Sequence, residues 1–318
     1  MIMEDIIKKI NESSIIGITY HVSPDGDAVG SALALLQGIR KLGKISYILS
    51  KDVISEDLGF LPCSSEIDNE VYEPKDDTDL VIILDCGNLE RVSAELGNYK
   101  GTTVNIDHHL SNDKYAQINY VDTNASATAE IVYSLLKAMN VIVNKDMATC
   151  LYTSIVTDTG SFRHSNVTKR THEIAGELIS LGINNSVVHS ELFDNKPIES
   201  LILLGEVIKN IRTYFNGKVS VLEITNRICD SIGIPPEEVA DVVNFGLQVK
   251  GVEVAVLLKE ASNGIKVSLR SKNNFDVRNI AGLFGGGGHS KASGVFFKEK
   301  SIDEAKELLL SAIEKELI

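Results

Sequence analysis

The sequence of 318 residues lacks several features that would assign it to a membrane or secreted class. No apolar run approaches the roughly 18 to 20 residues that cross a bilayer. The N-terminal MIMEDIIKKINESS has no signal-peptide core and predicts a short amphipathic helix. The four cysteines lie far apart and form neither a CxxC pair nor a zinc pattern. We therefore expect reduced thiols, a cytoplasmic location and no membrane partner.

Basic residues are also scarce. The chain has 31 Lys and Arg against 44 Asp and Glu, and so a formal net charge of −13. Proteins that bind long duplexes usually carry basic patches, so we expect no long duplex nucleic acid as a partner. An anionic substrate should instead be short, and local cations would have to attract it. Bound divalent metal ions could supply that charge.

The chain is long enough for two domains, and its first half alternates short apolar runs with helical patterns. We expect strands at 15–20, 45–49, 80–85 and 102–107, and helices at about 28–42, 126–140, 144–157 and 170–181. The strand runs are apolar on successive positions, as in parallel strands that are buried on both faces. This order predicts an α/β domain with a doubly wound, mainly parallel sheet.

The second half is different, because strands dominate it. They are expected at 219–224, 252–260 and 265–272, the last two joined by an ASNG hairpin turn, and a helix at 302–317 closes the chain. We predict an N-terminal domain over 1–182, a linker over 183–200 that could hold a helix of its own, and a smaller α+β domain over 201–318. The outer side of the linker helices could serve a homodimer.

Acidic residues and histidines gather where the predicted strands or helices of the first domain end. Ligands of open parallel sheets bind outside the carboxyl ends of the strands, so these clusters should converge there. Two imidazoles and four carboxylates suit Mn²⁺ or Mg²⁺, and six ligands suit two ions roughly 3.5 to 4 Å apart that share a carboxylate. The six candidate ligands are His21, Asp25, Asp27, Asp85, His108 and Asp158.

Most of these residues also have a structural interpretation. Asp25 and Asp27 could be turn and helix-capping residues around Gly26. Asp85 could be an ordinary solvated loop residue, and Asp158 a turn residue at the end of a helix. The acidic residue and two adjacent histidines at 107–109 have no routine packing purpose, which favours a functional site.

The motifs HVSPDGD, LVIILDCGN, NIDHHLSN and VTDTGSF, in this order, resemble the DHH phosphoesterase family. GGGGHSKASG at 285–294 resembles the signature of its DHHA1 partner domain. The resemblance spans nearly the whole chain and points to the branch of bacterial oligoribonucleases (nanoRNases) and pAp phosphatases. It implies a DHH domain followed by a DHHA1 domain.

The resemblance also implies roles for the six candidate ligands. His21 and Asp25 would hold one manganese ion, and Asp85 would bridge both ions. The second ion would be completed by three further residues, Asp27, His108 and Asp158.

Two more residues of the DHH motif would act beside the metal ions. Asp107 would orient the His108 ring, as partners of metal-bound imidazoles usually do. His109 would face the scissile phosphate and could donate a proton or hydrogen bond to a phosphoryl or leaving oxygen.

In the second domain the resemblance implies a binding site for the 5′-phosphate end of a short substrate. Gly286, Gly287 and Gly288 would let backbone amides approach a phosphate, which His289 would also face. Arg270 offers a planar fork for the same anion. As alternatives, the glycines could be a flexible loop, and Arg270 a solvated charge at a strand end. Ser290 stands where relatives often have a basic residue.

The implied function is a manganese-dependent phosphoesterase. It would hydrolyse very short 5′-phosphorylated RNAs to 5′-mononucleotides, dephosphorylate 3′-phosphoadenosine 5′-phosphate (pAp) to AMP, or do both. The alternative is a phosphodiesterase for cyclic dinucleotides or linear products such as pApA. A manganese pyrophosphatase would need a different C-terminal domain, and a RecJ-like exonuclease usually has further domains. A nucleotide sensor without turnover would show a broken ligand set, whereas all six ligands are present.

Overall fold

A computed structural model describes residues 2–235 and 242–317, which form two compact units over 1–195 and 196–318. The division between Asn195 and Lys196 falls inside the range 183–200 that the sequence suggests as a linker. None of the helices in these described ranges combines the length and apolar character that a bilayer crossing requires.

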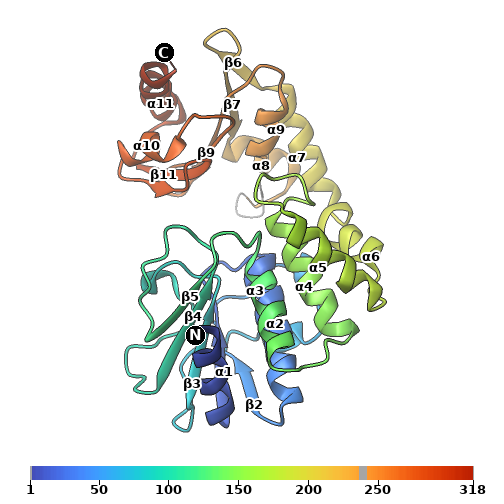
Figure 1. Cartoon of the computed structure of the whole chain (residues 1–318). Helices are drawn as coiled ribbons and strands as arrows, with labels where there is room; N and C mark the ends of the chain where they lie inside the picture. The colour runs from blue at the N-terminus through green and yellow to red at the C-terminus, as the bar shows by residue number, and fades with distance from the viewer. Residues whose placement is uncertain (1, 236–241, 318) are drawn as a thin grey trace. The chain divides into compact units, whose positions relative to one another are not determined.

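The first unit is built on a five-stranded parallel sheet (Figure 1). Its strand order is β2-β1-β3-β4-β5, so the chain reverses its direction of winding between β1 and β3. The α/β class with a parallel sheet is therefore confirmed. The edge strand β5 was not expected from its short sequence INYV, and its residues are only half-buried. The strands are β1 (Ile15–Thr19), β2 (Ile45–Ile48), β3 (Leu80–Leu84), β4 (Thr102–Asp107) and β5 (Ile118–Val121).

The α-helices of this unit pack against one face of the sheet. Ile16, Ile18 and Ile82 point into the core that these helices share, and the helical face is visible in Figure 1. Val81 and Ile83 point to the other face, which irregular segments cover. The helices are α1 (Ile2–Glu12), α2 (Gly26–Lys41), α3 (Thr128–Ala138), α4 (Lys145–Asp158), α5 (Lys169–Ser180) and α6 (Asn185–His189), followed by a π-helical turn, Ser190–Asp194.

Two glycines on α2 let α4 approach it closely. A Cβ atom on Gly30 would lie 2.4 Å from the backbone oxygen of Cys150, and one on Gly26 would lie 2.5 Å from the Thr157 side chain. Any larger residue at these positions would push the two helices apart. The glycines of GDAVG thus help to bring the last turn of α4, with Asp158, to the start of α2.

The second unit contains a six-stranded mixed sheet with the order β10-β11-β9-β8-β7-β6. Its strands are β6 (Arg212–Tyr214), β7 (Val219–Ile224), β8 (Val254–Ala261), β9 (Gly264–Ser271), β10 (Gly287–Gly288) and β11 (Ala292–Lys298). The expected hairpin between β8 and β9 is present, with Ala261 opposite Gly264. A flexible loop was the alternative interpretation of the glycine-rich segment, but this segment supplies β10 and leads into β11.

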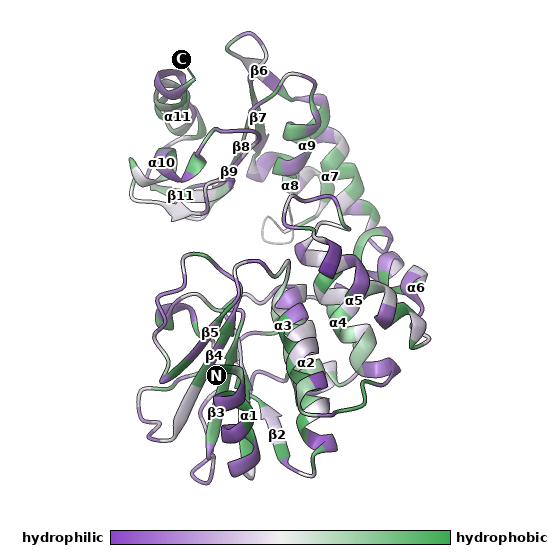
Figure 2. Ribbon diagram, viewed as in Figure 1, coloured by the Kyte–Doolittle hydropathy of each residue, from purple (hydrophilic) through white to green (hydrophobic). Residues whose placement is uncertain are grey.

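Helices pack against both faces of this sheet. α10 and α11 share a core with β8, β9 and β11, while α7, α8 and α9 share a second core with β7 and β8 on the opposite face. Figure 2 shows both purple and green residues on α11, as expected of an amphipathic helix. The helices are α7 (Ile198–Lys209), α8 (Asn226–Ile232), α9 (Val243–Gln248), α10 (Val277–Gly282) and α11 (Ile302–Glu316).

Candidate metal centre

The fold brings the six candidate ligands of the first unit together. The ligand atoms of His21, Asp25 and Asp85 lie within 4.8 Å of one another, and the same is true of a second group, Asp27, His108 and Asp158. Asp85 lies between the two groups. Its Oδ2 is 3.5 Å from His21 Nε2, and its Oδ1 is 3.5 Å from His108 Nε2. One carboxylate thus faces both groups, each with a different oxygen.

The strand order explains this convergence. β1 lies directly beside β3, although some sixty residues separate them in the chain. The winding reverses there, and in open parallel sheets ligands bind outside the carboxyl ends of the strands at such a point. His21 follows β1 and Asp85 follows β3, so both side chains reach this point. His108 arrives in the same way, directly after β4.

Backbone carbonyls orient both histidines of the cluster. His21 Nδ1 lies 2.9 Å from the oxygen of Val22, and His108 Nδ1 lies 3.2 Å from the oxygen of Ala125. When each Nδ1 donates to its carbonyl, Nε2 is the nitrogen that faces the carboxylates with its lone pair. This is the usual way in which a protein prepares imidazole for a metal ion.

Asp25 combines its two possible roles. Its Oδ1 caps α2 by accepting hydrogen bonds from the backbone N–H groups of Asp27 at 3.0 Å and Ala28 at 3.1 Å. Its Oδ2 lies 3.8 Å from His21 Nε2. The capping interpretation is therefore correct, and it does not exclude a ligand role, because the two oxygens have different partners.

Asp27 is buried where the N-termini of two helices meet. It stands in the first turn of α2, and its Oδ2 accepts a hydrogen bond of 2.7 Å from the backbone N–H of Thr128, at the start of α3. The hydroxyl groups of Ser31 and Ser154 donate to its Oδ1. Positive helix ends and hydroxyl donors stabilise a buried carboxylate. The same Oδ2 lies 3.7 Å from His108 Nε2.

Asp85 is held in an unusual backbone conformation. Its φ of +52° is in the left-handed region, although it is not a glycine. Such strain persists only when surrounding contacts enforce it, and it concentrates at functional sites. Here the contacts are the bond from Asp85 N–H to the oxygen of Ile106 and the bond of 3.1 Å from the Thr128 hydroxyl to Asp85 Oδ1.

Neighbouring carboxylates raise the pKa values of the histidines. Burial alone would lower the pKa of His21, but Asp25 and Asp85 outweigh burial and raise it to about 11. Burial would likewise lower the pKa of His108, and Asp85 with Asp27 raises it to about 11. In the metal-free protein both imidazole rings are therefore positively charged at neutral pH and offset the charge of the carboxylates.

The carboxylates respond to the same crowding. Burial and the charge of Asp85 raise the pKa of Asp27 well above its usual value. Burial also raises the pKa of Asp158 to about 7, although His108 opposes this shift. Burial would raise the pKa of Asp85 too, but hydrogen bonding to His108 and His21 holds it below its usual range. These carboxylates and imidazoles lie so close together that bound protons must offset the negative charge. Divalent cations can take the place of those protons, so the cluster suits a metal site.

The structure corrects one expected role in the DHH motif. Asp107 was expected to orient the His108 ring, but the ring partner of His108 is the Ala125 carbonyl. The ring that Asp107 orients is that of His109, whose Nδ1 lies 2.7 Å from Asp107 Oδ1. Toward His108, Asp107 accepts only the backbone N–H. Burial would lower the pKa of His109, but the hydrogen bond to Asp107 raises it.

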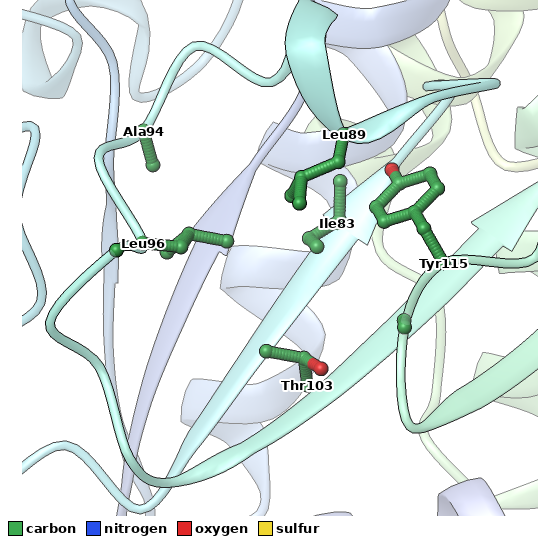
Figure 3. Close-up of a pocket in the computed structure, with 8 residues that line it drawn as sticks. Ile83, Leu89, Ala94, Leu96, Thr103 and Tyr115 are labelled. Carbon is green, nitrogen blue, oxygen red and sulfur yellow. The ribbon is translucent and has the colours of Figure 1, made fainter.

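A polar network holds Asp107 from the other side. Asn112 Nδ2 donates to Asp107 Oδ2 at 2.6 Å and to Asn105 Oδ1 at 2.8 Å. Asn105 in turn lies within hydrogen-bond distance of the Tyr115 hydroxyl. Tyr115 also lines a cavity of about 290 Å³ on the face of the sheet without α-helices (Figure 3). None of the six candidate ligands is among the residues that line this cavity.

The candidate residues of the second unit gather at one end of its sheet. Arg270 on β9 lies opposite Ala292 on β11, which is hydrogen-bonded to His289 through the backbone. Gly287 and Gly288 form β10 and pair with Gly294 and Ser293. A Cβ atom on Gly286 would lie 2.2 Å from the oxygen of Gly294. These glycines therefore allow close pairing of backbone segments, and a role in phosphate binding stays a prediction.

Sequence reasoning missed Thr128, although it connects the two ligand groups. Its N–H binds Asp27 and its hydroxyl binds Asp85. It lies in the run NASATAE, where a small hydroxyl residue at a helix start is ordinary. The sequence therefore contains no signal for this role, which depends on the contact between the start of α3 and Asp85, directly after β3.

We expect Thr128→Val to weaken Mn²⁺ binding by roughly 10- to 100-fold, the usual effect of losing a partner that orients a metal ligand. Valine keeps the shape and the backbone N–H but removes the hydrogen bond to Asp85. Thr128→Ser should stay within a few-fold of wild type. Calorimetric titration of the metal-free proteins measures both.

The matched control is Thr153→Val. Thr153 is buried on α4, and its hydroxyl has no hydrogen-bond partner within the described ranges. This variant should bind Mn²⁺ as wild type does. Equal affinities for Thr128→Val and Thr153→Val would show that Thr128 does not position Asp85.

Comparisons with known proteins identify relatives of this chain. Residues 15–155 match the DHH family, N-terminal domain, and residues 216–316 match the DHHA1 domain. The bifunctional oligoribonuclease and PAP phosphatase NrnA of Thermus thermophilus is 34% identical over 94% of this chain and 89% of its own length. Its Bacillus subtilis counterpart is 32% identical over 96% of each chain.

Two further proteins extend the comparison. The crystal structure of an exopolyphosphatase-related protein from Bacteroides fragilis has a TM-score of 0.92, with 28% identity over 99% of this chain and 96% of that one. The cyclic-di-AMP phosphodiesterase PdeA of Listeria monocytogenes is 24% identical over 99% of this chain, which covers 49% of that protein.

Proposed function

This chain belongs to the DHH/DHHA1 family, and from that premise we propose that it is a two-metal phosphoesterase. It hydrolyses very short oligoribonucleotides to 5′-mononucleotides and removes the 3′-phosphate of pAp. The observation that carries this proposal is the position of Asp85, whose two oxygens face two separate ligand groups. A pair of metal ions that share a carboxylate requires such an arrangement.

In this proposal each ligand group holds one divalent ion. His21 and Asp25 hold the first ion, Asp85 contributes to both, and the second ion is held by Asp27, His108 and Asp158. When bound, two such ions supply a water molecule of lowered pKa and offset the charge of the phosphoryl oxygens. The protein contributes by keeping the ligands fixed: two backbone carbonyls hold the histidine rings, and Thr128 holds Asp27 and Asp85.

His109 has a different task. Water adds to phosphorus and loses one proton, the bond from phosphorus to the ribose oxygen breaks, and that oxygen takes up a proton. The His109 ring is suited to provide the proton, because Asp107 fixes its orientation and raises its pKa. General acid catalysis of this kind contributes roughly 10²- to 10⁴-fold.

The second unit binds the substrate's phosphate end in this proposal. Arg270, His289 and the glycine-rich strand lie together at one end of its sheet. A local cluster of this size is compatible with the net charge of −13, since a short anion needs no extended basic surface.

The proposal is tested with purified protein, Mn²⁺ and a panel of substrates. We expect release of 5′-mononucleotides from 5′-phosphorylated di- and trinucleotides, conversion of pAp to AMP, and little action on a 24-nucleotide RNA. A protein that leaves both the dinucleotide and pAp intact contradicts the proposal.

The Listeria relative favours a second candidate, a phosphodiesterase for cyclic dinucleotides or their linear products. The panel therefore includes cyclic di-AMP and pApA. Preferential turnover of these two substrates would support it.

Three finer points remain part of the proposal. Manganese fits the mixed imidazole and carboxylate donors, as Mg²⁺ or Co²⁺ also would. A cytoplasmic location is supported by four free cysteines, three of them buried. A homodimer is supported by a stripe of exposed apolar residues on α7, namely Ile198, Leu201, Ile202 and Ile208.

A further inference from the structure

We propose that the exposed face of β9 and β11 in the second unit is a stacking platform for single-stranded RNA, with Phe296 at its centre. The platform consists of Lys266, Ser268, Arg270, Ala292, Gly294, Phe296 and Lys298. This inference rests on the proposed function and deepens it. The platform would favour oligonucleotides over pAp, because only an oligonucleotide has a second base that can reach Phe296.

Strand register places these residues on one face. Arg270 pairs with Ala292, Ser268 with Gly294 and Lys266 with Phe296. Residues directly opposite each other on paired strands point to the same side of a sheet, and alternate residues share that side. The intervening residues Val267, Leu269, Val295 and Phe297 point the other way, into the buried core.

Phe296 is unusual in this setting. Half of its surface is accessible, at 49%, although its neighbour Phe297 is buried at 6%. The helices α7, α8 and α9 share their core with β7 and β8, and none of the platform residues belongs to that core. A ring that exposes half of its surface in the middle of a regular strand offers an apolar face on which a nucleobase can stack.

Positive charge surrounds this ring, although the whole chain is strongly acidic. Lys266 lies opposite Phe296, and Lys298 follows two residues later on the same side. Lys298 is within 3.7 Å of Glu299, but both side chains are largely exposed, and such pairs are weak. An aromatic ring flanked by flexible cations is the combination that binds single strands, since the ring stacks on a base and the cations contact phosphates.

The spacing indicates which part of a substrate would reach the ring. Arg270 stands four residues from Lys266 along β9, which is about 14 Å in an extended strand. Between them lie Ser268 and its partner Gly294, and Ala292 lies opposite Arg270, so the residues along this path are small. A strand whose phosphate end lies at Arg270 can therefore run along the sheet face, and the base over Phe296 belongs to a later nucleotide. The single nucleoside of pAp is too short to span this distance.

We expect Phe296→Ala to raise KM for a 5′-phosphorylated pentanucleotide about tenfold, as loss of one stacked base does, with little change in kcat. The ratio of kcat/KM for the pentanucleotide to that for pAp should fall by the same factor. Phe296→Tyr should restore both values, because tyrosine also stacks. The matched control is Phe193→Ala, which removes another half-exposed phenylalanine, in the first unit.

Direct binding provides a second measurement. A pentanucleotide with a 3′ fluorescent label, in EDTA so that turnover is suppressed, should bind Phe296→Ala about tenfold more weakly than Phe193→Ala. Suppose that wild type turns over the pentanucleotide and pAp, and that Phe296→Ala changes neither KM nor this affinity. The stacking proposal is then wrong, and the proposed function stands. If wild type turns over neither substrate but Phe296→Ala still weakens binding, the proposed function is wrong and the surface binds RNA for another purpose.

Discussion

Asp85→Asn is expected to reduce turnover of both the dinucleotide and pAp by at least about a thousandfold, because it removes several kcal/mol of metal-dependent stabilisation. Asparagine has nearly the same size as aspartate but replaces one carboxylate oxygen with an amide group. It therefore cannot face His21 and His108 with two anionic oxygens, as Asp85 does. Kinetics at saturating Mn²⁺ measure the loss.

Metal stoichiometry shows whether this loss has the proposed cause. Wild type should bind two Mn²⁺ ions per chain, and Asp85→Asn one or none, whereas Asp146→Asn, which changes an exposed aspartate at the start of α4, should bind two. Full stoichiometry and turnover in Asp85→Asn would contradict the shared-carboxylate arrangement. If wild type and both variants bind nucleotides with the same affinity and none of them turns the nucleotides over, the protein is a sensor.

The ligand cluster was predictable because a rule of topology links strand ends to a crevice. His21, Asp85 and His108 each follow a buried apolar strand, and the sequence shows these junctions directly. Parallel strands place their carboxyl ends at one edge, so local patterns sufficed to predict a long-range meeting. The orientation of each ring was not predictable in this way, since it depends on carbonyls such as Ala125 O, which come from elsewhere in the chain.

The errors have related physical causes. Asp107 was assigned to His108 because the two are adjacent, but adjacent residues on a strand end point in different directions, and Asp107 meets the ring of His109 instead. The strand β11 (ASGVFFK) was missed because it begins with three small residues, and alanine and glycine have low strand propensity. Val295, Phe296 and Phe297 favour a strand, and pairing with β9 extends that strand back to Ala292.

His109→Gln is the second change with a large expected effect. We expect a loss of roughly 10²- to 10⁴-fold in kcat for the dinucleotide, whose ribose leaving group needs a proton. A p-nitrophenyl phosphodiester should lose far less, because nitrophenolate leaves without protonation. Asp107→Asn should show the same dependence on the leaving group in weaker form, since it disturbs only the hydrogen bond that orients the His109 ring.

The comparison of leaving groups separates a proton donor from a metal ligand. His109 Nδ1 is near Asp85 and His108, in a group that could itself hold an ion, but its 2.7 Å hydrogen bond to Asp107 engages this nitrogen. If His109 is a proton donor, His109→Gln keeps two Mn²⁺ ions and loses activity selectively with poor leaving groups. If it is a ligand, Mn²⁺ stoichiometry falls and both substrate classes lose activity equally. The Asp107 carboxylate orients the His109 ring and contacts His108 only through the His108 backbone N–H. We therefore expect the first result.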